Sequence, residues 1–106
     1  MIAAMWNASG WLKIENQTEA DIEFKFNDLL RDSGFTVLNF VDHVFEPHGW
    51  TALWLLGESH FAIHTFPGKD EGEMYYWELS SCIEEKYDAF MEQMNKFEQI
   101  NPMGGV

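Results

Sequence analysis

The sequence predicts an α+β fold, a two-layer α/β sandwich in which a mainly antiparallel sheet carries two helices on one face. The expected elements follow the order strand, helix, four strands, helix. Strands that follow one another in a chain mostly pair antiparallel through tight turns, and the helices can then cover one face of the sheet. The chain has 106 residues, the size of one domain with one hydrophobic core. We therefore expect a single domain over residues 1–106.

The first part of the chain predicts one short strand and one amphipathic helix. We assign residues 1–9 to an irregular N-terminal arm and residues 10–15 to the first strand. Asn16 and Thr18 are candidate N-caps of the helix, and Gly34 is the candidate residue that ends it. The apolar residues between these positions recur at helical spacing: Ile22, Phe26, Leu29 and Leu30. This helix should therefore pack one apolar face against the sheet.

The rest of the chain predicts four strands and a second helix. The strand candidates are separated by turns that contain glycine, proline or acidic residues: 35–45, 50–56, 60–66 and 74–80. Ser81 and Glu84 have the spacing of a capping box, which would place Cys82 at the first helical position. Apolar residues then recur on one helical face: Ile83, Tyr87, Phe90, Met94 and Phe97. We assign residues 98–106 to a C-terminal tail.

Charge and composition exclude several classes of partner. The formal net charge of −12 argues against nucleic acid and anionic membranes, because both require basic patches, and it suits a small cationic substrate. The single cysteine, Cys82, excludes an internal disulfide and a cysteine-rich zinc site, and we expect no metal. The chain lacks a signal peptide and a run of transmembrane length. We therefore expect a cytoplasmic protein.

An apolar stretch in the middle of the chain carries polar residues that a buried strand has little reason to contain. Residues 57–67 include Glu58, Ser59, His60 and His64, with aromatic and aliphatic residues before and after them. Each buried polar group needs a hydrogen-bond partner. The stretch therefore indicates either a reactive centre built on a sheet or a strand whose polar groups are satisfied by backbone or water.

Three motifs in and after this stretch resemble the prokaryotic S-adenosylmethionine decarboxylase family: Glu58-Ser59-His60, His64-Thr65-Phe66-Pro67 and Glu78-Leu79-Ser80-Ser81-Cys82. The resemblance extends over roughly residues 10–97. Enzymes of this family are made as one chain that cuts itself at a Glu–Ser bond, and the serine becomes a pyruvoyl group. The resemblance implies cleavage between Glu58 and Ser59 and a pyruvoyl cofactor derived from Ser59. Such a group serves as an electron sink for decarboxylation, as pyridoxal phosphate does.

The resemblance also implies roles for four other residues. His64 matches the family's processing histidine, which would remove the α-proton of the reacting serine. Thr51 stands where the family has a serine that supports processing. Cys82 matches the proton donor of the decarboxylation, and Phe45 matches an aromatic residue that stacks on adenine. For Cys82 and Phe45, ordinary packing is the alternative interpretation.

One position departs from the family pattern. Four residues after the processing histidine, the family has a glutamate that binds the ribose hydroxyls, whereas this sequence has Gly68. Carboxylates at Asp70, Glu71 and Glu73 follow in a connection that looks lengthened. The resemblance therefore supports decarboxylase chemistry better than it supports S-adenosylmethionine as the substrate.

Three functions stay open. The first is a pyruvoyl-dependent S-adenosylmethionine decarboxylase that feeds polyamine, mainly spermidine, synthesis. The second is an enzyme of the same class that acts on another amino acid, such as ornithine or arginine, and the change at Gly68 motivates it. The third is a relative that neither cuts itself nor catalyses and serves as a binding domain. Thr51 and an apparently missing terminal strand motivate this third function.

The expected pairing of two strands gives a geometric prediction. If Phe66 lies opposite Tyr75 in an antiparallel hairpin, Ser59 lies opposite Cys82 on the same face, and a slip of one residue would break this relation. Alternation places Ser59 and His64 on opposite faces of a straight strand. Bringing them together in one chain therefore requires a bulge or a chain break near Ser59.

We also expect a homodimer. The strand segments 50–56 and 75–79 are apolar on both faces, but two helices can cover only one face of the sheet. Burying an exposed aromatic patch against a second copy is the common solution; the aromatic residues in question are Trp50, Trp54, Tyr75 and Trp77. The family resemblance implies a dimer too, with sites formed from both subunits. The alternative is a monomer whose N-terminal arm, with Met1, Ile2, Met5 and Trp6, covers that face.

Overall fold

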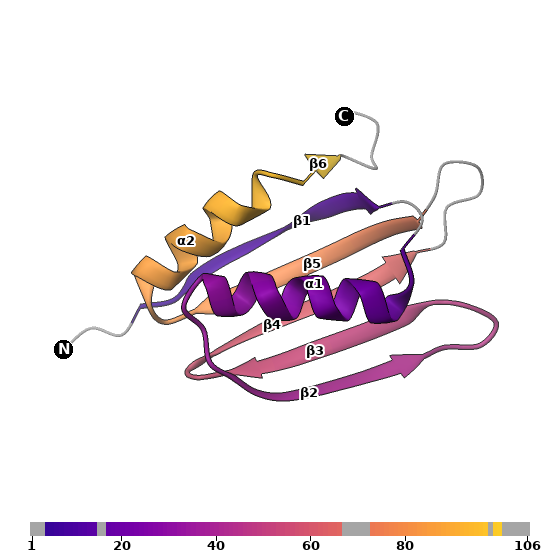
Figure 1. Cartoon of the computed structure of the whole chain (residues 1–106), viewed down its shortest axis with the longest axis horizontal. Coiled ribbons are helices and arrows are strands. Elements are labelled where there is room, and N and C mark those ends of the chain that lie inside the picture. The colour runs from indigo at the N-terminus through magenta and orange to yellow at the C-terminus, as the bar shows by residue number, and fades with distance from the viewer. Residues whose placement is uncertain (1–3, 15–16, 67–72, 98, 101–106) are drawn as a thin grey trace.

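The computed structural model describes residues 4–14, 17–66, 73–97 and 99–100, and these residues form the predicted two-layer α+β sandwich (Figure 1). Within them, one six-stranded sheet has the order β2-β3-β4-β5-β1-β6, and all neighbouring strands pair antiparallel. Both helices lie on the same face of the sheet (Figure 1). The elements are β1 (Trp6–Ile14), α1 (Glu19–Asp32), β2 (Val37–Val44), β3 (Trp50–Leu56), β4 (Ser59–Phe66), β5 (Glu73–Ser81), α2 (Glu84–Met94) and β6 (Gln99–Ile100).

Helix α1 begins and ends where its sequence predicts. The Thr18 hydroxyl accepts a hydrogen bond from the Asp21 amide at 3.1 Å, and the Asp21 carboxylate accepts one from the Thr18 amide at 3.0 Å. This capping box satisfies two amides that the first turn would leave without partners. Gly34 follows the helix with φ +99°, a left-handed conformation that suits glycine at the end of a helix.

The core lies between the helices and the sheet and consists largely of aromatic side chains. Trp54 is 1% exposed, and its indole nitrogen donates to the Asn27 side chain of α1 at 2.7 Å. Phe26 of α1 stacks on Phe61 of β4 at 5.2 Å between ring centroids and on Phe97 at 5.6 Å. Phe97 therefore contributes to the core although α2 ends at Met94.

The four aromatic residues that we expected in an exposed patch are instead part of this core. Trp50, Trp54, Tyr75 and Trp77 are each at most 2% exposed. They alternate onto the face that the helices cover, so this part of the argument for a dimer is wrong. The residues that β3 turns toward the other face are Leu53 and Leu55, which are 45% and 54% exposed.

The predicted N-terminal arm is wrong over residues 6–9, because β1 begins at Trp6. This strand pairs with β5 from Trp6 opposite Ser81 to Ile14 opposite Glu73. Asn7 and Ala8 are weak strand formers, so the local sequence did not indicate this part of β1, which forms because it pairs with β5. Residues 6–9 therefore do not cover the free face of the sheet; Met1 and Ile2 lie outside the described residues.

The predicted start of the second helix is also wrong. Helix α2 begins at Glu84, and its N-cap is Ile83, which makes no side-chain capping bond. Ser81 and Glu84 therefore do not form a capping box, and Cys82 lies in the turn before the helix rather than in its first turn. Beyond α2, the short strand β6 occupies part of the predicted C-terminal tail and pairs with β1.

Among the described helices, neither has the length and apolar character needed to cross a lipid bilayer.

Candidate active site

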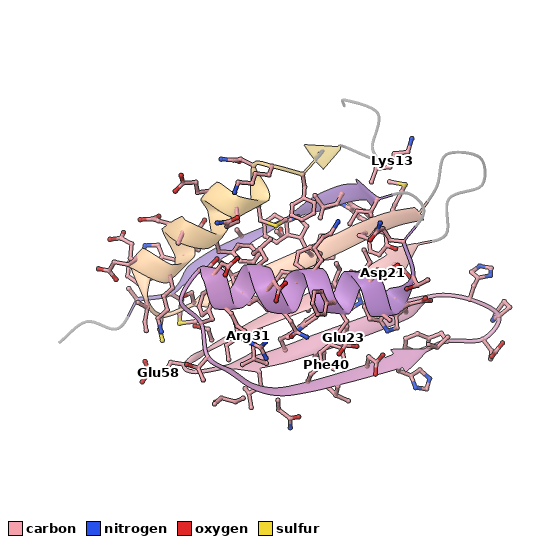
Figure 2. The ribbon with its side chains drawn as sticks, viewed as in Figure 1. Lys13, Asp21, Glu23, Arg31, Phe40 and Glu58 are labelled. Carbon is pink, nitrogen blue, oxygen red and sulfur yellow. The ribbon has the colours of Figure 1, made fainter. Side chains whose placement is uncertain are left out.

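The predicted cleavage bond lies in the tight turn between β3 and β4. Leu56 of β3 pairs with Ser59 of β4, so Gly57 and Glu58 form a two-residue connection at one end of the sheet, where Figure 2 shows Glu58. Glu58 has φ 60°, in the left-handed region. For a residue with a Cβ this conformation costs roughly 1–2 kcal/mol, and such strain persists where the surrounding structure fixes it. The peptide bond between Glu58 and Ser59 therefore lies at the end of a strained turn.

Ser59 is buried and its hydroxyl has no hydrogen-bond partner. The residue is 7% exposed and begins β4, with its side chain on the helix-covered face. Its Oγ contacts no donor or acceptor within hydrogen-bond distance in the part of the chain that the structure describes. Buried hydroxyls without partners are uncommon because desolvation is costly. A hydroxyl in this state is not occupied by another bond and can act as a nucleophile.

Cys82 contacts the peptide group that precedes Ser59. Its thiol donates to the Glu58 carbonyl oxygen at 2.7 Å and lies 3.6 Å from Glu58 Oε2. The predicted register is wrong by one residue, because Phe66 pairs with Met74 and Ser59 pairs with Ser81. Cys82 nevertheless reaches the predicted cleavage bond, since it follows Ser81 in the turn toward α2.

His64 forms a separate pair with Thr51 on the free face of the sheet. Thr51 lies opposite His64 in the β3–β4 pairing, and its Oγ1 is 2.9 Å from His64 Nδ1, within one hydrogen bond. Tyr76 lies opposite His64 on β5, with 6.2 Å between the ring centroids. The hydroxyl at position 51 therefore holds the imidazole, although threonine replaces serine there.

One chain does not bring His64 to Ser59. The two residues are five positions apart on β4, which is about 16 Å along a strand, and they point to opposite faces. The pairing of β4 with β3 and with β5 is regular from Ser59 onward, so the bulge that would have been needed near Ser59 does not form. The predicted processing residues therefore lie in two clusters.

Phe45 is also far from Ser59. It follows β2 at the β2–β3 turn, is 47% exposed, and packs its ring 4.6 Å from that of His43. The β2–β3 and β3–β4 turns lie at opposite ends of β3, whose seven residues span about 20 Å (Figure 1). Gly68, Asp70 and Glu71 lie outside the described residues.

Two hollows on the free face meet at His60, a residue to which we assigned no role from the sequence. One, of about 350 Å³, is lined mainly by polar residues of β1, β4 and β5: Asn7, Ser9, His60, Glu78 and Ser80. The other, of about 300 Å³, includes exposed apolar residues of β2 and β3. The Tyr76 hydroxyl donates to Glu78 at 2.8 Å. Strand alternation could have identified this face, because positions 60, 62 and 64 share it with positions 76, 78 and 80.

The family model for S-adenosylmethionine decarboxylase matches residues 12–99, which is most of the chain. The chain belongs to this family. Over 49 residues it is 45% identical to the S-adenosylmethionine decarboxylase proenzyme of Parasynechococcus marenigrum, a match that covers 46% of this chain and 38% of that relative. Over 52 residues it is 57% identical to S-adenosylmethionine decarboxylase proenzyme 2 of Bacillus anthracis, covering 49% and 42% of the two chains.

The fold is similar to that of a solved member of the family. The crystal structure of the adenosylmethionine decarboxylase from Aquifex aeolicus matches with a TM-score of 0.65 at 19% identity, over 92% of this chain and 88% of that one. The curated relatives are matched over about two-fifths of their own length, 38% and 42% in the two cases above. Among the described residues, no three side chains of the histidine, cysteine or acidic kinds gather as metal ligands.

Proposed function

We propose that this chain is a proenzyme that cuts itself between Glu58 and Ser59 and then acts as a pyruvoyl-dependent decarboxylase of S-adenosylmethionine. Family membership and the names of the relatives support the activity. The observation that best supports self-processing is the conformation and hydrogen bonding of the peptide group between Glu58 and Ser59. Glu58 is left-handed, its carbonyl oxygen accepts the Cys82 thiol, and the next hydroxyl is buried without a partner in the described structure.

The first step is an attack within the chain. The Ser59 hydroxyl oxygen bonds to the Glu58 carbonyl carbon, negative charge develops on the carbonyl oxygen, and the C–N bond breaks as the amine takes up a proton. The result is an ester in place of the peptide. The Cys82 thiol, 2.7 Å from that oxygen, is placed to stabilise the developing charge. Opening the turn also releases the left-handed conformation of Glu58.

The second step needs a base. Removal of the α-proton of residue 59 expels the Glu58 carboxylate by β-elimination and leaves dehydroalanine. Water then replaces the nitrogen, which leaves as ammonia, and a pyruvoyl group caps the 59–106 fragment. His64 is the base in this proposal, and Thr51 orients its ring through the 2.9 Å bond at Nδ1.

We infer that His64 acts on Ser59 of a second chain. The separation of about 16 Å within one chain supports this inference. Consider two chains packed free face to free face, related by a two-fold axis that lies between the sheets and runs perpendicular to the strands. The strands of one chain then run opposite to those of the other. This arrangement would bring His64 and Phe45 of one chain toward the Glu58–Ser59 turn of the other from the free-face side. From there His64 acts on the α-proton of residue 59, because the Ser59 hydroxyl itself lies on the covered face. The exposed side chains of Val41, Leu53 and Leu55 on the free face support burial against a second copy.

In the processed enzyme, the pyruvoyl group derived from Ser59 supplies the electron sink for loss of the substrate carboxylate as carbon dioxide. Cys82 delivers the proton that takes the place of the carboxylate, and Phe45 stacks on the adenine of the substrate. The net charge of −12 favours a cationic substrate over an anionic one. We place the reaction in the cytoplasm, as a step toward spermidine.

Gly68 favours a second candidate, the same chemistry on ornithine or arginine. Neither substrate has a ribose, so neither needs the carboxylate that Gly68 replaces. Incubating the purified, processed protein with each of the three compounds and identifying the decarboxylated product decides between the candidates. A product from ornithine or arginine alone would overturn S-adenosylmethionine as the substrate.

Intact mass of the purified protein tests the self-processing. We expect two fragments, residues 1–58 and residues 59–106. The second fragment should be lighter, by the mass of one ammonia, than the same fragment with an N-terminal serine, because its first residue is a pyruvoyl group. Ser59→Ala should remain one chain. A wild-type chain that stays whole after long incubation at neutral pH would count against the proposal and favour a binding domain that never matures.

A further inference from the structure

A buried serine stands beside the proposed nucleophile and has no part in the chemistry described so far. Ser81 ends β5, is 0% exposed, and lies directly opposite Ser59 on β4. Opposed residues in an antiparallel pair point to the same face, so both hydroxyls lie on the helix-covered face of the sheet. Two buried serines therefore lie side by side at the cleavage turn.

The two hydroxyls have different hydrogen bonds. Ser81 Oγ donates to the Ile83 carbonyl oxygen and accepts from the Ile83 amide, both at 3.0 Å. A serine hydroxyl has one hydrogen, so Ser81 has none to donate to its neighbour. Ser59 Oγ, in contrast, contacts no partner in the described residues. Because the Ser81 hydroxyl bonds to Ile83, it does not form a hydrogen bond with the Ser59 hydroxyl.

The same bonds fix the turn that carries Cys82. Cys82 is the residue between Ser81 and Ile83, and Ile83 is the N-cap of α2 without a side-chain capping bond of its own. The two contacts from Ser81 thus tie the end of β5 to the first turn of α2. With both of its neighbours held, the Cys82 thiol is directed to the Glu58 carbonyl oxygen, 2.7 Å away.

We propose that Ser81 is a positioning residue for self-processing, and that its hydroxyl holds the turn 81–83 in the one conformation in which the Cys82 thiol reaches the scissile carbonyl. This inference rests on the proposed function. Loss of the hydroxyl leaves the Ile83 amide without its partner and leaves the Ile83 carbonyl bonded to the Tyr87 amide of α2 alone, at 3.1 Å, so the turn can relax and the thiol can move away. A shift of about 1 Å in a catalytic contact can slow a reaction by about 100-fold.

The first experiment measures the rate of cleavage between Glu58 and Ser59 in Ser81 variants. Ser81→Ala should slow cleavage by about 10-fold to 100-fold. Ser81→Thr keeps the hydroxyl and should retain most of the wild-type rate. Ser81→Val, whose side chain has the shape of threonine but lacks the hydroxyl, should not. Ser33→Ala is the matched control, because Ser33 is also buried and donates to a backbone carbonyl, that of Leu29 at 2.8 Å, without contacting Cys82. Cleavage of Ser81→Val at the rate of Ser81→Thr would overturn the proposal.

The second experiment does not depend on cleavage. Cys82 is the single cysteine of the sequence, so a maleimide reports its accessibility alone. In the uncut Ser59→Ala background, Ser81→Ala should raise the rate of alkylation several-fold, Ser81→Thr should not, and Ser33→Ala should match the background. Equal rates in all four proteins would overturn the positioning role. If the wild-type chain never cuts itself, the proposed function fails, while this comparison still decides what Ser81 does.

Discussion

The two faces of the sheet carry different chemistry on the same strands. On the covered face, aromatic side chains such as that of Trp54 meet the helices and are almost completely buried. On the free face, β3 exposes Leu55, and β4 carries His64 in its bond with Thr51. The covered face is thus complete within one chain, whereas the free face combines exposed apolar groups with one half of the proposed processing machinery.

This difference explains why one chain contains all the residues predicted for processing but does not bring them together in one site. Ser59 and Cys82 meet at the β3–β4 turn, and His64 lies about 16 Å along the same strand on the other face. Regular alternation is what lets β4 contribute Phe61 to the core and His64 to the free face. In the proposed dimer, a second copy would both bury the exposed apolar groups and complete the site, so related experiments test the two proposals.

The largest expected effect comes from combining two inactive chains. His64→Ala and Ser59→Ala should each fail to cut when made alone, since one lacks the base and the other the nucleophile. When they are made together, the base on the Ser59→Ala chain can serve the serine of the His64→Ala chain in a mixed dimer. We expect intact mass to show cleavage of the His64→Ala chain only.

The opposite result would place the whole site in one chain. If mixed dimers form, as two differently tagged copies can show, and no His64→Ala chain is cut, then His64 does not act across the interface. Rapid cleavage of His64→Ala made alone would remove the residue from processing altogether.

The sequence predicted the covered layer better than the site, and the reasons are physical. Thr18 and Gly34 mark the ends of α1 because a cap and a left-handed glycine are local requirements. The motif around Ser59 led to the proposed cleavage bond because polar residues in a buried strand need a reason. Both signals lie within a few residues of the feature that they predict.

What the sequence could not give depends on contacts between distant residues. The β4–β5 register came out one residue away from the expected one, because no local signal in the connecting segment sets it. Gly10 lies in β1 because Trp77 packs against its backbone: a Cβ there would come within 3.0 Å of the Trp77 indole nitrogen. The reason for a glycine at this position is visible only once the pairing of β1 with β5 is known.

The next largest effect concerns the residue that links the two proposed reactions. Cys82→Ala should lower kcat by about 10²-fold to 10⁴-fold, the usual contribution of a general acid, and change KM little, because proton delivery acts on the chemical step. The activity has to be expressed per processed chain, since the variant also loses the 2.7 Å contact with the Glu58 carbonyl and should mature slowly. An unchanged kcat in fully processed protein would reject the role.

A third prediction compares the faces directly through two neighbours on β3. Trp54→Ala removes a side chain that is 1% exposed and should lower the free energy of unfolding by about 3–5 kcal/mol. Leu55→Ala should change the stability of the dilute monomer much less, because Leu55 is 54% exposed. Leu55→Asp should instead weaken dimerisation, leaving a mass near 12.4 kDa in sedimentation equilibrium.

Two results would alter this comparison. If wild type itself keeps a mass near 12.4 kDa as its concentration rises, the dimer is wrong. If Leu55→Ala in dilute solution destabilises the chain as much as Trp54→Ala, part of the protein covers the free face within one monomer.

The smallest expected effect is at the surface of the covering layer, where α1 begins. Hydrogen bonds from the Thr18 amide and the Thr18 hydroxyl hold the pKa of the Asp21 carboxyl below its ordinary value. A carboxyl whose pKa is lower in the folded state stabilises the fold fully above its ordinary pKa, and loses that contribution as the pH falls through the lowered one. Asp21→Asn should therefore be slightly less stable than wild type at neutral pH, and the difference should shrink in strong acid. Urea unfolding of both proteins from pH 7 downward measures this difference, with Thr18→Ala as the control that removes the hydroxyl but keeps the backbone amide that donates to the Asp21 carboxylate. A gap between wild type and Asp21→Asn that widens in acid would show that the carboxylate opposes the helix rather than capping it.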